Sequence, residues 1–227
     1  MTNESPNPDQ LRAVRSSLAL ILMAAVMLLV DVRIPLPFVE GRWDLFSDLV
    51  GMLLALVGVF RMPSRELEGP QAHANPYSSA ITVTRVAAFV GLGGILASPL
   101  LDEVGFAWRM VLYLVELVGL VAYSFAMKLW CENAGLEKRS LAFDRAAWFF
   151  MIQTVAILGL HIHDGFERFH MVRGIERQWL DGDFGLSLPF EIALAFVVAV
   201  SIPAIQLVAA TSCTYLSLGS RIHERAV

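Results

Sequence analysis

Residues 104–128 read VGFAWRMVLYLVELVGLVAYSFAMK, and Arg109, Glu116 and Lys128 are the only charged residues among them. A single α-helix needs about 20 residues to cross the hydrocarbon layer of a membrane, which is roughly 30 Å thick. In lipid the backbone must satisfy its own hydrogen bonds, which leaves helices and closed barrels as the structures that can span. The stretch therefore predicts a membrane-spanning helix.

The rest of the chain has the same character. Hydrophobic residues make up 56% of the 227 positions and charged residues 17%, whereas a soluble domain carries about 25% charged residues. The apolar residues form runs separated by short charged segments. Six spans are predicted, at about residues 16–34, 45–62, 80–101, 104–128, 146–163 and 188–213. The expected fold class is all-α, an integral membrane bundle of six helices with a short interfacial helix after the fifth.

The remaining segments complete the expected domain organisation. Residues 1–15 are polar and predict a disordered tail. Residues 16–219 form the transmembrane domain, and residues 220–227 form a second tail. Both tails are expected in the cytoplasm.

Lysine and arginine set the expected orientation. Eleven of the 17 lie on the side of the N-terminus and six on the other side. The positive-inside rule then places both termini in the cytoplasm. The expected location is a bacterial inner membrane, with the lipid bilayer as the first partner. The net charge of −4 has no concentrated block behind it, so no nucleic-acid partner is expected.

Two spans carry small residues at helical spacing, which let helix backbones approach each other closely in lipid. These residues are Ser47, Gly51, Ala55 and Gly58 in the second span and Ala87, Gly91, Gly94 and Ser98 in the third. Packing within the chain is one interpretation of the two stripes. A homodimer, or contact with another membrane protein, is the alternative.

A charged group inside a span raises the free energy of inserting that span into the membrane, so its presence calls for a structural or functional explanation. Glu116 lies about twelve residues from both ends of the fourth span, with Arg109, Tyr113 and Tyr123 on the same helical face. The tight turn between the third and fourth spans places Glu116 level with residue 89, about 6 Å along the axis from Arg85. An ion pair between Arg85 and Glu116 is predicted. It would either fix helix register or form part of a relay or polar cavity.

Asp48 is a further polar candidate, since it lies deeper in the second span than helix capping explains. A pattern D-x3-D-x2-G-x6-G surrounds it, formed by Asp44, Asp48, Gly51 and Gly58. With the preceding RIPLPF and the later NPY at residues 75–77, residues 30–80 resemble a group of uncharacterised bacterial membrane proteins. The resemblance implies a polytopic membrane protein and no particular activity.

Histidines gather in the stretch GLHIHDGFERFH, residues 159–170. If the fifth helix continues through it, His163, Glu167 and His170 share one side, which is typical of an amphipathic helix in the membrane interface. His163 and His170 are then about 10.5 Å apart along the axis and cannot share one zinc ion, whose ligands lie about 2 Å away. A metal site using His161, His163, Glu167 and His170 would need irregular backbone or ligands from elsewhere. No cofactor other than such a metal ion is expected.

Three classes of function remain open. A non-enzymatic accessory or scaffold protein fits the packing stripes and the lack of catalytic motifs. A small-solute or ion transporter would use Glu116 and Arg85. A membrane-embedded metalloenzyme would use the stretch from His161 to His170.

Overall fold

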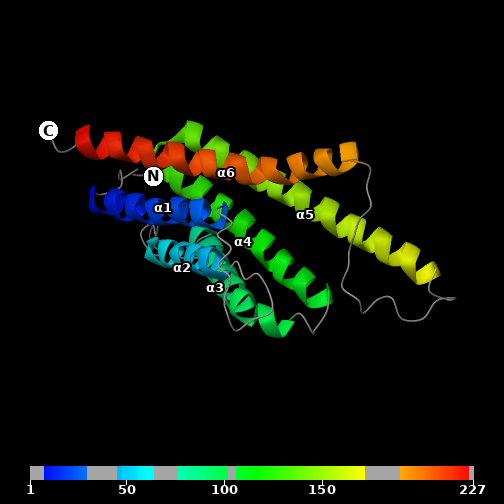
Figure 1. The fold of residues 1–227 in the computed structure, drawn as a ribbon. Coiled ribbons are helices and arrows are strands. Elements are labelled where there is room, and N and C mark those ends of the chain that lie inside the picture. The colour runs from blue at the N-terminus through cyan, green and yellow to red at the C-terminus, as the bar shows by residue number, and fades with distance from the viewer. Residues whose placement is uncertain (1–7, 30–44, 64–75, 102–105, 172–189, 225–227) are drawn as a thin grey trace.

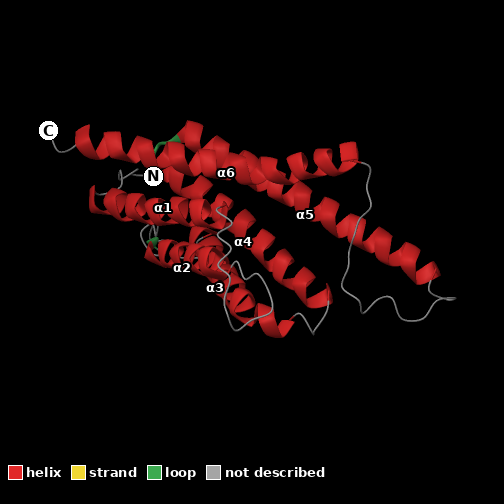
Figure 2. Cartoon of the chain, in the orientation of Figure 1, coloured by secondary structure: helices red, strands yellow, loops and turns green. Residues whose placement is uncertain are grey.

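The structure is a computed structural model that describes residues 8–29, 45–63, 76–101, 106–171 and 190–224, with side chains for 8–28, 49–63, 76–97, 111–155 and 201–224. Within these ranges the chain is all-helical and has no strand (Figures 1 and 2). The helices are α1 (Pro8–Leu29), α2 (Leu45–Arg61), α3 (Pro76–Leu101), α4 (Phe106–Asn133), α5 (Glu137–Met171) and α6 (Phe190–Glu224).

Each predicted span overlaps one helix, and several helices are longer than their spans. Residues 30–34 of the first predicted span and 188–189 of the last lie outside the described residues. Helix α1 begins at Pro8, so residues 8–15 are helical where a disordered tail was expected. Helix α5 begins at Glu137 instead of residue 146, and α6 continues to Glu224, into the expected C-terminal tail. Hydropathy marks only the apolar part of a helix, whereas helix formation continues through polar turns. At the start of α1, Pro8 and Asp9 are residues that a first turn favours.

Within the described part of the chain, four helices are long and apolar enough to cross a membrane. They are Pro8–Leu28, Pro76–Ala97, Val111–Asn133 and Ser201–Glu224. The apolar part of α2, Leu49–Arg61, is shorter. In α5 the expected span, 146–163, extends past residue 155, where the described side chains of that helix end.

Consecutive helices pack against each other along the chain, and α6 returns to α1. Figure 1 shows the start of α1 and the end of α6 at the same end of the bundle, while α5 extends away from its neighbours toward its C-terminus. We call the end that holds the start of α1 and the end of α6 the terminal end. An even number of crossings would have this geometry.

Among the described side chains, which lie mainly toward the terminal end in α2, α4, α5 and α6, most of the buried apolar ones form one core. It draws on the first turns of α1, α3 and α5 and on the last turns of α2, α4 and α6. Its largest fully buried side chains include Phe143, Leu11, Leu18, Met62, Ile81, Met127 and Leu218. Elsewhere large apolar side chains are exposed, such as Phe89 at 66% and Val155 at 70%. A lipid environment would cover these side chains.

Both small-residue stripes are used inside the chain. A side chain at Gly51 or Gly58 would collide with Leu28 or Ile21 of α1, at 2.8 Å in each case. Gly94 of α3 faces Leu112 of α4 with equally little space. These close approaches favour packing within the chain as the purpose of the stripes.

The turn between α4 and α5 is short because α4 ends in a glycine-containing cap. Gly135 has a φ of 67°, the left-handed conformation that glycine adopts without steric cost. The Leu136 N–H donates to the Cys131 carbonyl and the Gly135 N–H to the Glu132 carbonyl, which is the Schellman pattern. Most of the polar segment after the fourth span is therefore helix, and the turn is too short to hold a separate domain.

Candidate intramembrane polar site

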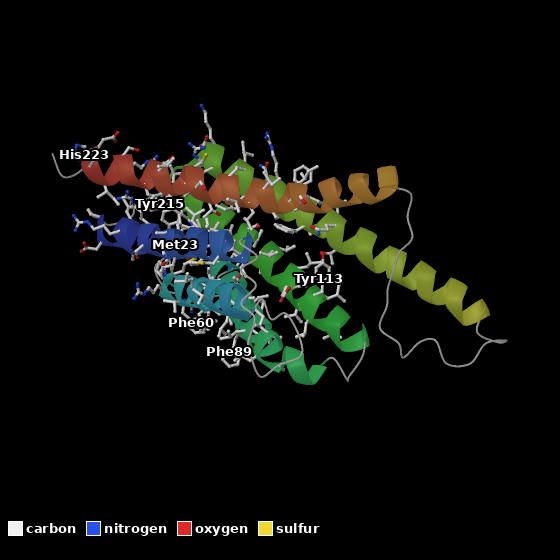
Figure 3. All side chains as sticks on the ribbon, viewed as in Figure 1. Met23, Phe60, Phe89, Tyr113, Tyr215 and His223 are labelled. Carbon is white, nitrogen blue, oxygen red and sulfur yellow. The ribbon has the colours of Figure 1, made fainter. Side chains whose placement is uncertain are left out.

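Two polar side chains meet between α4 and α5, and a third lies one turn away on α4. Gln153 of α5 donates from Nε2 to the hydroxyl oxygen of Tyr113 on α4, at 3.2 Å. Glu116 lies one turn along α4 from Tyr113 and interacts with it electrostatically. We call Tyr113, Glu116 and Gln153 the polar cluster. Tyr113 is labelled on α4 in Figure 3.

One polar atom of the cluster has no protein partner. Gln153 is only 9% exposed, and its Oε1 atom is buried without a hydrogen bond to any described residue. Exchanging the amide oxygen and nitrogen would let Tyr113 donate to Gln153, but the NH2 group would then lose its acceptor. A buried polar atom without a partner carries a desolvation cost of about 1–3 kcal/mol. The polar cluster could therefore accept a proton donor such as water or a protonated solute.

Glu116 itself faces α3. Its Oε1 atom lies 3.4 Å from the position that a Cβ atom on Gly91 would occupy, and the Met52 side chain of α2 reaches the same point. The absence of a side chain at Gly91 therefore gives the carboxylate room beside α3. The small-residue stripe and the partly buried acid meet at this glycine.

The predicted ion pair between Arg85 and Glu116 is wrong. Arg85 instead donates to three carbonyls at the end of α2, those of Val59, Phe60 and Met62, at 3.3, 3.3 and 2.7 Å. Its guanidinium carbon also lies 5.4 Å from the centre of the Phe60 ring.

The cause of the error is the direction of the side chain around α3. Ala87 is the residue that faces α4, where it meets Gly119. Positions two apart on a helix of 3.6 residues per turn point about 200° apart. Arg85 therefore points away from α4 and toward the carbonyl end of α2, which attracts a cation.

Tyr123 belongs to the core and not to the polar cluster. It is 4% exposed, and its ring packs edge-on against Phe143, with 6.3 Å between centroids. Its hydroxyl lies beside Thr211 but has no hydrogen bond of normal geometry among the described residues. The hydroxyl of Thr211 donates to the Leu207 carbonyl of its own helix. Side chains at the other two predicted polar positions, Asp48 and Arg109, lie outside the described ones.

The histidine stretch continues α5 as regular helix to Met171. On a regular helix, positions 163 and 167, or 167 and 170, lie on the same side, and position 161 lies on another. The stretch alone therefore offers one ion at most two ligands, and a metal site stays a prediction that needs ligands from outside it. The side chains of residues 161–170 are outside the described ones, and among the described side chains no group of three histidines, cysteines or acids could hold a metal.

The sequence interpretation missed a second set of polar contacts, at the terminal end. Arg221 of α6 donates from Nη1 and Nη2 to the carbonyls of Ala134 and Gly135, at 2.5 and 3.0 Å, and so caps α4. Lys128 of α4 pairs with Asp144 of α5 at 2.6 Å. An arginine near the end of a helix is a known signal for such caps, but the sequence does not show which helix end the arginine will contact.

A further missed contact joins α1 to α6. The Arg15 guanidinium lies 4.8 Å from the centre of the Tyr215 ring and 3.1–3.5 Å from the position that a Cβ atom on Gly219 would occupy. Figure 3 shows Tyr215 on the side of α6 that faces α1. Arg15 therefore lies in the seam between the first and last helices.

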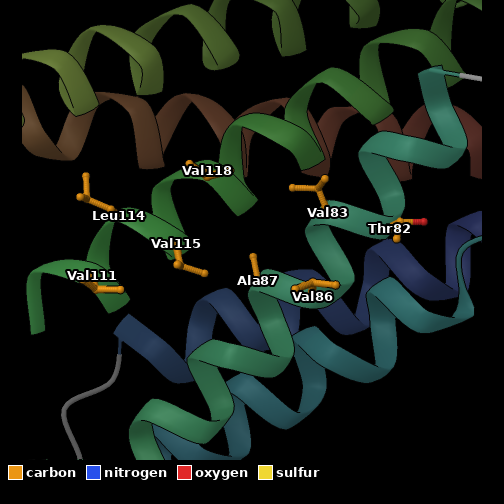
Figure 4. Close-up of a pocket in the computed structure, with 8 residues that line it drawn as sticks. All are labelled: Thr82, Val83, Val86, Ala87, Val111, Leu114, Val115 and Val118. Atoms are coloured by element: carbon orange, nitrogen blue, oxygen red, sulfur yellow. The ribbon is translucent and has the colours of Figure 1, made fainter. Parts of the chain in front are cut away.

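A pocket among the described side chains is apolar. It is a groove of about 420 Å³ between α3 and α4, lined by Thr82, Val83, Val86, Ala87, Val111, Leu114, Val115 and Val118 (Figure 4). The Thr82 hydroxyl already donates to the Ser78 carbonyl. The groove suits apolar matter such as a lipid chain and offers no chemistry for a reaction.

Comparison with known protein families, with curated proteins and with solved structures gives no match for this chain. The resemblance around Asp48 stays a prediction. The proposed function therefore depends on the geometry of this chain alone.

Proposed function

We propose that the chain spans a bacterial inner membrane six times with both termini in the cytoplasm, and that it acts as a non-enzymatic accessory or scaffold protein. Four helices of membrane-crossing length support the membrane placement. Helices α2 and α5 pack between them in sequence order, which favours two further crossings. In the full sequence, eleven of the 17 lysines and arginines fall on the side of the N-terminus, which favours a cytoplasmic terminal end.

A stripe on α5 is the observation that carries the accessory role. Trp148, Ile152 and Val155 recur at helical spacing on one face of α5 and are 58%, 60% and 70% exposed. The other faces of this part of α5 pack on α4 and α6. A large aromatic residue followed by branched aliphatic residues is a surface that a helix of another membrane protein can pack against.

Photo-crosslinking in the native membrane tests this role. With a crosslinking amino acid at Ile152 we expect one adduct of constant mass with another membrane protein. The matched control is Phe89, which is similarly exposed on α3. If Ile152 and Phe89 both give only lipid-sized adducts, α5 faces lipid and the accessory role loses its support.

The polar cluster favours a second candidate function, proton-coupled transport. Glu116 can carry a proton, and the buried Gln153 Oε1 atom lacks a donor. A carboxyl group inside a membrane protein is a usual element of proton relays. Arg85 has no part in this version of the transporter hypothesis, because its guanidinium already donates to carbonyls at the end of α2.

Proton flux into proteoliposomes, driven by a potassium diffusion potential and followed with a pH-sensitive dye, tests this candidate. Replacing Glu116 by glutamine is expected to remove the flux, because an amide cannot carry the proton. The exposed Arg61→Gln variant should retain it. Flux that persists in Glu116→Gln, or that is absent from the unmodified protein, would exclude a proton relay through this carboxyl group.

A further inference from the structure

We propose that Arg15 binds the phosphate group of an anionic phospholipid in the seam between α1 and α6, at the cytoplasmic face of the membrane. The inference rests on the membrane placement proposed above and is independent of the accessory and transport roles. Arg61 and Arg145 at the terminal end are exposed to solvent. The inference starts from a difference between the partly buried Arg15 and four other arginines at this end, Arg12, Arg85, Arg139 and Arg221.

Those other arginines use their donors within the protein. Arg85 and Arg221 donate to carbonyls at the ends of α2 and α4. Arg139 donates to the Ser217 hydroxyl at 3.2 Å, and the exposed Arg12 lies 3.6 Å from Asp9. Each of these cations therefore has an oxygen partner.

Arg15 has none among the described residues. Its Nε atom is buried without a hydrogen bond, and its guanidinium contacts the Tyr215 ring and the surface of Gly219. The two Nη atoms of Arg15 are not buried in this way, and the side chain as a whole is partly exposed. The guanidinium is thus held in place along one edge while its Nη donors remain accessible.

The shape of the seam contributes to this arrangement. Because Gly219 has no side chain, the guanidinium can lie flat against α6 with Tyr215 on its face. Stacking on an aromatic ring fixes the plane of a guanidinium and leaves its N–H groups free to donate in that plane. Two parallel N–H donors match two oxygens of a phosphate group.

The position in the membrane selects the ligand. Arg15 precedes the apolar residues from Leu18 onward in α1, and Gly219 lies five positions before the end of α6. On the proposed topology this level is the cytoplasmic interface, where anionic headgroups lie and where basic pockets between helices bind them. A phospholipid phosphate would complete the hydrogen bonding of Arg15, and its acyl chains could run along the exposed apolar side chains of α1, such as Val26.

Native mass spectrometry of the full chain in detergent, titrated with phosphatidylglycerol, tests the proposal. We expect one tightly bound lipid, with affinity lowered about tenfold in Arg15→Gln, because a charge-assisted hydrogen-bond pair is lost. Arg12→Gln is the matched control, since it removes an exposed charge one turn away and should bind as the unmodified protein does. Equal binding by Arg15→Gln and Arg12→Gln would overturn the proposal.

Two further variants remain informative if Arg15→Gln does not fold. Arg15→Lys keeps the charge but loses the planar donors, and Gly219→Ala pushes the guanidinium away from α6, so both should bind lipid more weakly. Full binding by both would overturn the assignment to Arg15.

The source of the phosphate is tested with inorganic phosphate alone. If millimolar inorganic phosphate displaces the lipid from the unmodified protein but not from the variants, the site takes a free anion and the lipid assignment is wrong. A protein that binds no phospholipid at all would contradict the proposal, whatever the crosslinking at Ile152 shows.

Discussion

Replacing Gly119 by alanine is expected to lower the free energy of unfolding by about 1–3 kcal/mol, the usual cost of adding a methyl group to a packed contact. A Cβ atom at Gly119 would lie 2.5 Å from the Cβ atom of Ala87, far inside contact distance. Ala87 has no side-chain torsion that could move this atom aside, so α3 and α4 must separate. Reversible unfolding in mixed micelles, followed by circular dichroism, measures the change.

Gly93 provides the matched control on the same helix pair. A Cβ atom there would meet nothing within 4 Å, so Gly93→Ala should leave stability unchanged or raise it by up to about 1 kcal/mol through helix propensity. Adding Ala87→Gly to the Gly119→Ala variant should recover part of the loss, because it removes the colliding atom. An equal loss in Gly93→Ala would show that the α3–α4 contact is not the cause.

The register of the α3–α4 hairpin could be predicted from the sequence. A short turn between two long apolar runs permits only antiparallel neighbours, and counting outward from the turn places Glu116 level with residue 89. In the structure Glu116 lies beside Gly91, and Leu112 and Gly119 meet Gly94 and Ala87. Position along the axis follows from a rise of about 1.5 Å per residue, so an error of one or two residues is small.

The rotation of a helix about its axis was harder to predict. Arg85 was placed at a suitable height to reach Glu116, but its direction depends on which face of α3 meets α4. The small residues Ala87, Gly91 and Gly94 lie on the faces that meet neighbouring helices, and this could have shown that Arg85 points away from α4. The attraction of the carbonyl end of α2 could not be read from the third span alone.

Neutral polar groups and helix ends were underestimated for a different reason. Charged residues stand out inside an apolar span, whereas Gln153 is a single uncharged residue in an apolar run. The sequence therefore predicts no role for it. In the structure Gln153 carries the unpartnered oxygen of the polar cluster. The spans were also ended where charges begin. Lys128 and Asp144 show why α4 and α5 continue past that point, since their ion pair joins the two helices beyond the apolar segments.

Replacing Arg85 by glutamine is expected to lower the free energy of unfolding by about 1.5–3 kcal/mol, the range for hydrogen bonds to a charged group. The substitution removes three bonds to α2 carbonyls together with the contact of the guanidinium with the Phe60 ring. These carbonyls belong to the last turn of α2 and the residue after it, where a helix supplies few N–H donors. The Val59 carbonyl also accepts from the Met62 N–H, at 3.3 Å. Hydrogen exchange should therefore quicken in that turn more than in α3.

Arg61 separates loss of the cap from loss of charge. It lies at the end of the same helix, is exposed, and its substitution by glutamine should change stability by no more than about 0.5 kcal/mol. A double-mutant cycle then tests the direction of Arg85. Because Arg85 faces α2 and Glu116 faces Gly91, the effects of Arg85→Gln and Glu116→Gln should add within about 0.5 kcal/mol, as for residues without shared partners. A larger coupling energy would restore the ion pair across the hairpin and would mean that the capped arrangement is not the one that stabilises the protein.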